Sequence, residues 1–289
     1  MSTPPTLTLP SCATASRLVT ARGEFAVHDA RPPAGAAVRG TALLVPGFTG
    51  SKEDFIALLE PLAGAGFRVV AVDGRGQHET GGPRDEGAYA RSELAQDVLA
   101  QIAALGGGVH VLGHSLGGLI VRAAALREAS GFASLTLLSS GPAAISASQQ
   151  ERTKLLLDAL AVLDMASVWQ AMRDLDPPEA PEATAPAEVR EFLRRRWMST
   201  VPEQLIATGR QLVSEPDRVA ELAAVPTVKH VVSGEVDYAW PVPLMDAMAD
   251  RLAARRTVVA DAGHSPNAEQ PTACARALAD FWRGVTDGA

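Results

Sequence analysis

The sequence contains few cysteines and no long apolar run. Its 289 residues include only Cys12 and Cys274, too few for a disulfide framework or a cysteine metal site. No stretch of about 18 uncharged apolar residues is present, so we expect no membrane span. The first residues (MSTPPTLTLPSCATASR) lack a basic region followed by an apolar one, which argues against a secretory signal. These absences predict a soluble, cytoplasmic globular protein.

Positive charge is also scarce. The chain has 26 Lys and Arg residues against 33 Asp and Glu residues, a formal net charge of −7. A surface that follows a nucleic-acid backbone needs clustered positive charge, so we expect no nucleic-acid partner. At 47% hydrophobic and 20% charged residues, the composition suits a packed core and argues against disorder.

Short apolar runs alternate with helical stretches in the first half of the chain. The runs at 42–45, 69–72, 109–112 and 135–138 are nearly continuous, which is typical of strands buried on both faces. Between the first two, Ser51 and Asp54 resemble a capping box, which predicts the start of a helix. This alternation implies right-handed crossovers and a mostly parallel sheet. The predicted fold class is therefore α/β.

The alternation stops after residue 144. Residues 145–224 have a helical pattern, and strand signals return at 228–232 and 257–260. We therefore expect one core, formed by residues 16–144 and 225–289, with residues 145–224 as a helical insertion. Residues 1–15 are rich in Pro, Thr and Ser and are predicted to form a flexible tail. The four prolines between Asp176 and Pro186 predict a flexible connection within the insertion.

The segment Gly113-His114-Ser115-Leu116-Gly117 has the pattern G-x-S-x-G. The motif is weak alone, but here it follows a predicted strand and opens a predicted helix, which is the context a nucleophile elbow requires. Glycines at both ends leave room for a sharp turn. We therefore expect Ser115 at the carboxyl edge of the sheet, above the positive end of a helix.

With this motif and order of elements, residues 17–285 resemble the α/β-hydrolase superfamily of serine hydrolases. The resemblance implies an eight-stranded, mostly parallel sheet with helices on both faces. It also implies that residues 145–224 form a helical cap, inserted after the sixth strand. No metal or organic cofactor is implied, and the expected partner is a small-molecule substrate.

The resemblance also indicates the other members of a catalytic triad. Asp237 matches the family position of the acid in Gly234-Glu235-Val236-Asp237, with Glu235 and Asp261 as rival carboxylates. His264, in the loop after the last predicted strand, matches the base. Ser115, Asp237 and His264 follow the chain order of this fold.

The resemblance places an oxyanion hole at the loop Pro46-Gly47-Phe48-Thr49-Gly50. By position, the backbone N–H groups of Phe48 and Leu116 are the expected donors. The family usually carries histidine where this chain has Pro46, so the side-chain support behind the loop is expected to differ.

The insertion is expected to cover the site and to select the substrate. Apolar or aromatic side chains there favour a hydrophobic acyl or alcohol group, although many of them also suit the insertion's own core. Arg194, Arg195 and Arg196 form either an anion contact or a solvated helix face, and His78 is a further candidate. The residues expected to contact substrate are His114, Trp169, Trp197, Tyr238 and Trp240.

These observations predict a carboxylic-ester hydrolase that works through an acyl-serine intermediate. The same triad also serves thioesterases, lactonases, C–C bond hydrolases and cofactor-free haloperoxidases or perhydrolases. A ligand-binding receptor that kept the hydrolase fold is the non-enzymatic alternative. The sequence leaves these alternatives open.

Overall fold

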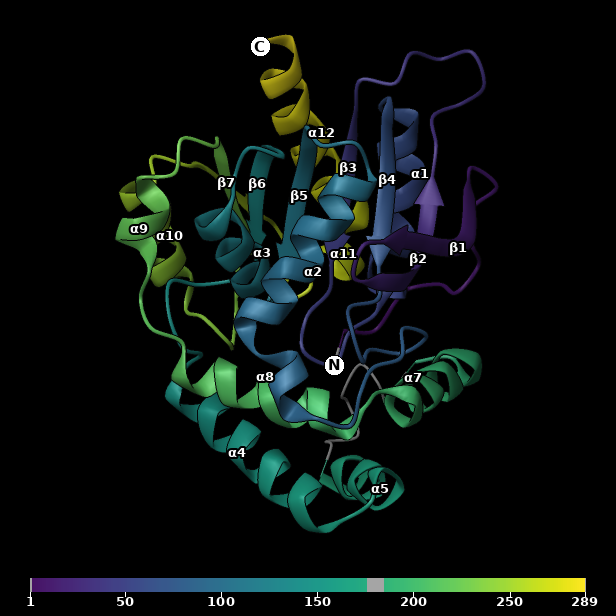
Figure 1. Cartoon of the computed structure of the whole chain (residues 1–289), viewed down its shortest axis with the longest axis vertical. Coiled ribbons are helices and arrows are strands. Elements are labelled where there is room, and N and C mark those ends of the chain that lie inside the picture. Colours follow the sequence, from purple (N-terminus) through teal and green to yellow (C-terminus); the bar gives the residue numbers. More distant parts are fainter. Residues whose placement is uncertain (1, 176–184, 289) are drawn as a thin grey trace.

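An eight-stranded sheet forms the centre of the molecule (Figure 1). The computed structural model describes residues 2–175 and 185–288. The strand order is β1-β2-β4-β3-β5-β6-β7-β8; β2 runs antiparallel to β1 and β4, and the other pairs are parallel. The predicted mostly parallel, eight-stranded sheet is confirmed. The strands are β1 (Ala13–Thr20), β2 (Gly23–Ala30), β3 (Gly40–Val45), β4 (Phe67–Val72), β5 (Val109–His114), β6 (Phe132–Leu138), β7 (Lys229–Gly234) and β8 (Arg255–Val259).

The central strands bury both of their faces. In β3, Leu43 and Val45 join one hydrophobic cluster, whereas Ala42 and Leu44 join another. Successive side chains of a strand point to opposite sides of a sheet, so each face needs its own cover. This explains why the apolar runs in the sequence are continuous and do not alternate.

Helices cover both faces of the sheet. One face packs against α2 (Arg91–Ala104), α3 (Leu116–Arg127) and α10 (Val242–Arg251), and the other packs against α1 (Ile56–Gly64) and α12 (Pro271–Asp287). Shorter elements are η1 (Lys52–Phe55), η2 (Glu86–Tyr89) and α11 (Pro266–Glu269). The capping box at Ser51 and Asp54 is present at the start of η1. No helix within 2–175 or 185–288 is long and apolar enough to cross a membrane.

A helical layer lies between β6 and β7 in the sequence and below one end of the sheet in Figure 1. It contains α4 (Ala147–Val162), α5 (Met165–Leu175), α7 (Ala187–Ser199) and α8 (Pro202–Ser214). The next helix, α9 (Val219–Ala223), lies beside α10 in Figure 1, and its Val219 and Leu222 join the main core. We call residues 145–224 the helical insert. Its buried centre is formed by Leu160, Val168, Trp197 and Leu205. Of the connection expected between Asp176 and Pro186, residues 176–184 lie outside the described residues.

The segments just before α4 and just after α8 meet at Arg122 of α3, which is 1% exposed. Its guanidinium donates to the carbonyl oxygen of Pro142 (2.7 Å), just before the insert, and to Oε1 of Glu215 (2.6 Å), just after α8. Arg91 pairs with the second oxygen of Glu215. The chain therefore leaves and re-enters the core at one buried ion cluster.

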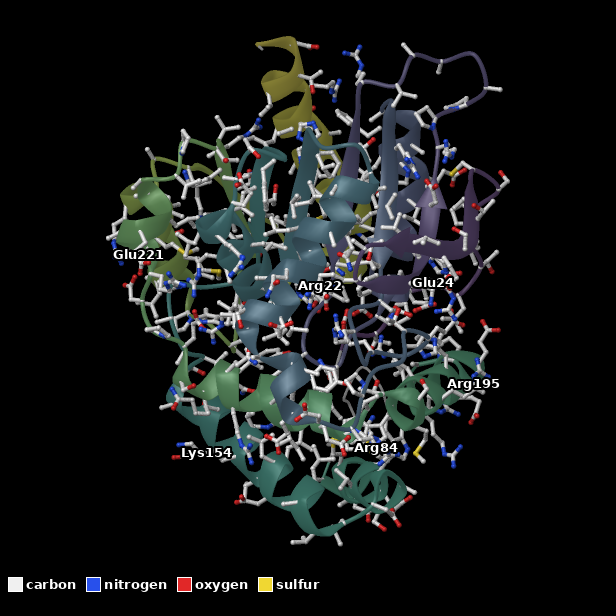
Figure 2. All side chains as sticks on the ribbon, viewed as in Figure 1. Arg22, Glu24, Arg84, Lys154, Arg195 and Glu221 are labelled. Atoms are coloured by element: carbon white, nitrogen blue, oxygen red, sulfur yellow. The ribbon has the colours of Figure 1, made fainter. Side chains whose placement is uncertain are left out.

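A second buried ion pair joins the middle of the insert to the core. Arg196 of α7 donates to Asp54 of η1 at 2.6 Å, and both side chains are almost fully buried. The carbonyl of Asp54 accepts from Asn267 of α11 at 2.7 Å. Arg194 and Arg195 are exposed, and Figure 2 shows Arg195 on the outer side of α7. The expectation of a solvated face is thus wrong for Arg196, which a helix turns toward the core.

The N-terminal segment is more structured than predicted. A flexible tail over 1–15 is wrong for residues 13–15, since β1 begins at Ala13 and pairs with β2. Before it, Leu7 packs against buried residues of α7, and the carbonyl of Ser2 accepts from Arg196 at 2.8 Å. Residues 2–12 therefore contact the helical insert as well as the core.

His110 and His230 are buried inside strands β5 and β7. His110 is 2% exposed, its Nδ1 lies 2.8 Å from Ser134 Oγ, and its ring stacks on Trp282. Burial lowers the pKa of His110 to about 4 and that of His230 to about 3. Both rings are therefore neutral at physiological pH.

These histidines make the fold sensitive to acid. Between about pH 4 and 6.5 the unfolded chain binds a proton at each histidine that the folded chain does not bind, so stability falls as pH falls. For His110 alone, we expect a loss of about 2 kcal/mol between pH 7 and pH 5. His110→Gln removes this titration, and urea unfolding at the two pH values should show a smaller loss for the variant. Equal losses in both proteins would contradict the prediction.

Candidate active site

The turn between β5 and α3 holds Ser115 in an unusual backbone conformation. Its φ is 54° and its ψ is −119°, values that cost a non-glycine residue about 1–3 kcal/mol. A Cβ on Gly113 would lie 2.5 Å from the backbone nitrogen of Gly118, and one on Gly117 would lie 2.6 Å from the carbonyl oxygen of Pro46. Glycine at both positions lets the turn close, as the G-x-S-x-G pattern predicts.

Two loops bring the partners of Ser115 to the same place. His264, after β8, has its Nε2 3.1 Å from Ser115 Oγ, and its Nδ1 lies 2.9 Å from each carboxylate oxygen of Asp237, after β7. The Asp237 side chain is fully buried and accepts from the backbone N–H groups of Ala239 (2.8 Å) and Trp240 (3.0 Å). Because a carboxylate accepts at Nδ1, the imidazole proton sits there and Nε2 faces the serine hydroxyl.

Glu235 and Asp261, the alternative candidates for the triad acid, are both exposed. Glu235 is exposed and accepts from the backbone N–H of Asp261 at 3.0 Å. Asp261 is also exposed and has a left-handed backbone, with a φ of 55°. Among the hydrogen bonds of the described residues, only Asp237 reaches Nδ1 of His264.

The loop after β3 passes directly over the serine turn. A Cβ on Gly47 would lie 3.2 Å from the Cβ of Ser115, so the loop and the turn are in close contact. The carbonyl of Gly47 accepts from Gln77 Nε2 at 2.8 Å. Gln77, from the loop after β4, therefore supports this loop from a position that the sequence analysis missed. The N–H groups of Phe48 and Leu116 stay the predicted oxyanion donors.

The side chain of Phe48 links this loop to the helical insert. It packs against the main core and also against the buried centre of the insert. Gly209 of α8 faces the ring, because a Cβ there would lie 3.2 Å from Phe48 Cζ. The position of α8 is thus coupled by contact to the loop beside Ser115.

Three of the residues expected to contact substrate are buried and bonded within the protein. The indole N–H of Trp197 donates to the carbonyl of Met165 (2.7 Å), and that of Trp240 donates to the carbonyl of Ala143 (2.8 Å). His114 is 3% exposed and contacts the backbone of His264. All three side chains are therefore packed and bonded inside the protein, which a sequence does not indicate because it shows a ring but not the side it faces.

Trp169 and Tyr238, the other two residues expected to contact substrate, differ in exposure. Trp169 is partly buried beside Trp197, with ring centroids 6.3 Å apart, and packs in the insert. Tyr238 is 58% exposed, and its ring centroid lies 4.8 Å from that of His264. Tyr238 is therefore the member of the predicted set that lies at the open side of the triad.

His78 contacts the insert. Its Nδ1 lies 3.0 Å from Ser199 Oγ, and its ring meets Phe192 of α7 edge-on, with centroids 5.5 Å apart. Its φ of 40° is another left-handed value. The structure thus places His78 at the junction between the loop after β4 and α7.

The first residue of η1, Lys52, has a buried side chain. Lys52 Nζ is 3.0 Å from Asp73, 2.8 Å from Glu53 and 2.9 Å from Glu79. Burial alone would lower the pKa of Lys52, but these carboxylates outweigh burial and raise it above the usual value.

In the described part of the chain, no group of three or more His, Cys, Asp or Glu side chains is placed to hold a metal ion.

Comparisons with known proteins agree with this architecture. A family model described as "Alpha/beta hydrolase family" matches residues 42–277. A thermophilic esterase from Thermogutta terrifontis superimposes with a TM-score of 0.74 at 25% identity, over 95% of this chain and 100% of that one. An enol-lactonase from Burkholderia xenovorans shares the fold, with a TM-score of 0.75 at 20% identity over 92% and 99% of the two chains.

Curated sequences are similar over a shorter stretch. A protein of Variovorax paradoxus assigned as the carbamate hydrolase RutD is 38% identical over 120 residues, which is 40% of this chain and 45% of that protein. Its counterpart in Agrobacterium fabrum is 39% identical over 110 residues, or 36% and 38% of the two chains. The chain thus spans less than half the length of these relatives.

The close backbone packing at the turn between β5 and α3 predicts how a substitution of Gly117 affects stability. Gly117→Ala should destabilise the protein by about 1–3 kcal/mol, because the new methyl overlaps backbone that cannot move away. Gly284, in α12, is the matched control, since a Cβ there meets nothing within 4 Å. Gly284→Ala should raise stability by about 0.5–1 kcal/mol. Urea unfolding measures both variants, and a neutral Gly117→Ala would disprove the steric argument.

Proposed function

The chain belongs to the alpha/beta hydrolase family, and on this premise we propose that it is a serine hydrolase. Its substrate is a carboxylic ester, or a related acyl compound, of small size and hydrophobic character. The observation that carries the proposal is the continuous hydrogen-bond chain from Ser115 through His264 to Asp237. A buried carboxylate, an oriented imidazole and a serine hydroxyl in this order have the geometry of nucleophilic acyl transfer.

The reaction begins at Ser115 Oγ. A serine hydroxyl is weakly nucleophilic at neutral pH, and His264 Nε2 lies at 3.1 Å, close enough to take its proton during attack on the acyl carbonyl. Asp237 holds the Nδ1–H tautomer and stabilises the imidazolium that forms. His264 then gives the proton to the leaving group. Water hydrolyses the acyl-serine by the same route.

Negative charge develops on the carbonyl oxygen during attack. The N–H of Leu116 begins α3, where the helix dipole favours an anion, and the N–H of Phe48 lies on the loop that crosses Ser115. Two such donors stabilise the tetrahedral intermediate, and each is typically worth about 10²–10³ in rate. Gln77 supports this loop through the carbonyl of Gly47.

The helical insert serves as the cap of this site and selects the substrate. Its α8 contacts Phe48, and Tyr238 lies at the open side of His264. Both side chains present aromatic surface, which favours an apolar acyl or alcohol group. The buried ion pairs at Arg122 and Arg196 hold the insert over the carboxyl ends of the strands.

A carbamate is the second candidate substrate. The curated relatives assigned as carbamate hydrolases favour it, and a carbamate has an acyl carbonyl open to the same attack. Lactonase, thioesterase, C–C bond hydrolase and perhydrolase activities also use this chemistry. Turnover of a short-chain ester, a thioester, a lactone and a carbamate by the same protein ranks these candidates, and we expect the ester to have the highest kcat/KM.

Ser115→Ala tests the central claim. The purified wild-type protein should hydrolyse a short-chain p-nitrophenyl ester and take up a fluorophosphonate probe at Ser115. The variant should do neither, because no other hydroxyl is placed against Nε2 of His264 in the described residues. Unchanged circular dichroism and unfolding midpoint show that the fold is intact. Turnover retained by the variant would reject a serine mechanism.

Asp237→Asn and Glu235→Gln form a matched pair two residues apart. Asn at 237 favours the wrong imidazole tautomer, so kcat should fall by about 10⁴, as in other triads. Gln at 235 leaves the triad untouched, so kcat should stay within about twofold, since Glu235 is exposed and contacts only the backbone of Asp261 in the described hydrogen bonds. Steady-state kinetics compare them. Loss of activity in the Gln variant alone would assign the acid to Glu235.

A further inference from the structure

His114 stands immediately before Ser115 and lies beneath the triad. It is the last residue of β5, is 3% exposed, and has its Nε2 2.8 Å from the backbone carbonyl oxygen of His264. Its ring centroid lies 5.2 Å from that of His264. Its side chain thus touches the residue that the proposed mechanism uses as the base, on the side away from solvent.

The partner of Nε2 determines the tautomer of His114. A carbonyl oxygen only accepts hydrogen bonds, so Nε2 carries the proton and Nδ1 carries none. Nδ1 is buried, has no hydrogen-bond partner, and would lie 3.5 Å from a Cβ on Gly47. A second proton on the ring would therefore point at the backbone of the loop after β3, where the structure offers it no acceptor.

Electrostatics keep the ring in this neutral form. Burial, together with the nearby imidazole of His264, lowers the pKa of His114 to about 3, against smaller opposing effects of its bond to His264 and of Asp237. His264 gains a proton during the proposed reaction. A neutral ring beside it adds no repulsion to that step, whereas a cation would.

Glu269 also holds the backbone around His264. The carboxylate of Glu269 accepts from the N–H of Gly263 (2.5 Å) and from that of Ser265 (2.9 Å). The N–H of Ser265 and the carbonyl of His264 belong to one peptide group, which Glu269 therefore holds at its N–H and His114 holds at its carbonyl oxygen from the buried side. Glu269 is exposed, so the bond from His114 is the one shielded from water.

We propose that His114 is a positioning residue, whose neutral Nε2–H holds the backbone carbonyl of His264 and so keeps its imidazole in reach of Ser115. This inference rests on the proposed function. It replaces the substrate contact that the sequence suggested for His114. A misplacement of about 1 Å at a reacting group can cost about 100-fold in rate, so the expected effect is on kcat.

Three substitutions of His114 distinguish the effect of its Nε2–H donor from the effect of the volume of its ring. Glutamine places an amide N–H at the same distance along the side chain as Nε2, whereas asparagine is too short and leucine has no donor. We expect His114→Asn and His114→Leu to lower kcat for a p-nitrophenyl ester by about 10–100-fold with KM within about twofold. His114→Gln should recover most of the loss.

His110→Leu is the control for general destabilisation. It removes another buried, neutral, hydrogen-bonded histidine from the same strand, about 13 Å along β5 from His114. Its unfolding midpoint should fall, but its kcat should not. The positioning role is overturned if the Asn and Leu variants keep wild-type kcat, if Gln is as slow as Leu, or if His110→Leu loses kcat to the same extent.

A measurement without substrate separates this inference from the proposed function. The Nδ1–H proton of His264, bonded to Asp237, should give a sharp downfield NMR signal in the wild type and in His114→Gln. In His114→Leu we expect the signal to broaden through exchange with water. An unchanged signal overturns the positioning role even if the protein is an esterase. Retained turnover in Ser115→Ala overturns the proposed function and leaves this signal as the deciding test.

Discussion

The structure depends on how closely the backbone segments approach one another around Ser115. Gly113 and Gly117 leave no room for a Cβ, and Gly117 lies against the carbonyls of Val45 and Pro46. Gly234, at the end of β7, makes a similar contact with the loop after β8, because a Cβ there would lie 2.5 Å from the carbonyl carbon of Ala262. The ends of β3, β5, β7 and β8 are thus packed backbone to backbone. The three side chains of the triad meet because their loops cannot move apart without opening these contacts.

Charged side chains at the boundary between core and insert act inside the protein. Glu215 binds Arg122, Asp54 binds Arg196, and Lys52 binds Asp73 and Glu53, all with little exposure. Buried ion pairs contribute little net stability compared with apolar packing, but losing one partner is costly. They therefore favour one arrangement of the insert over others.

Two kinds of feature could be predicted from the sequence: strands that are buried on both faces, and turns that only glycine can form. The apolar runs identified four central strands because those strands are buried on both faces, and the G-x-S-x-G motif placed Ser115 because glycine is needed at the turn. The edge strand β1 gave no signal, since most of Ala13–Thr20 is exposed and its burial does not alternate cleanly. The direction of a side chain was also beyond reach, as Arg196 and His114 show. Gln77 was missed because a single hydrogen bond to a backbone carbonyl leaves no pattern in the chain.

The convergence of Pro142 and Glu215 on Arg122 has a further consequence. Arg122 of α3 binds both Pro142 and Glu215, so the chain between these two residues is a loop whose two ends are anchored at α3. The length of such a loop affects the entropy of closing it only slowly. The segment between these anchors is therefore a module that evolution or a protein engineer can exchange as a cassette. An exchanged segment still has to supply a partner for Asp54 and for Phe48, because Arg196 and α8 of the present segment contact these two core residues.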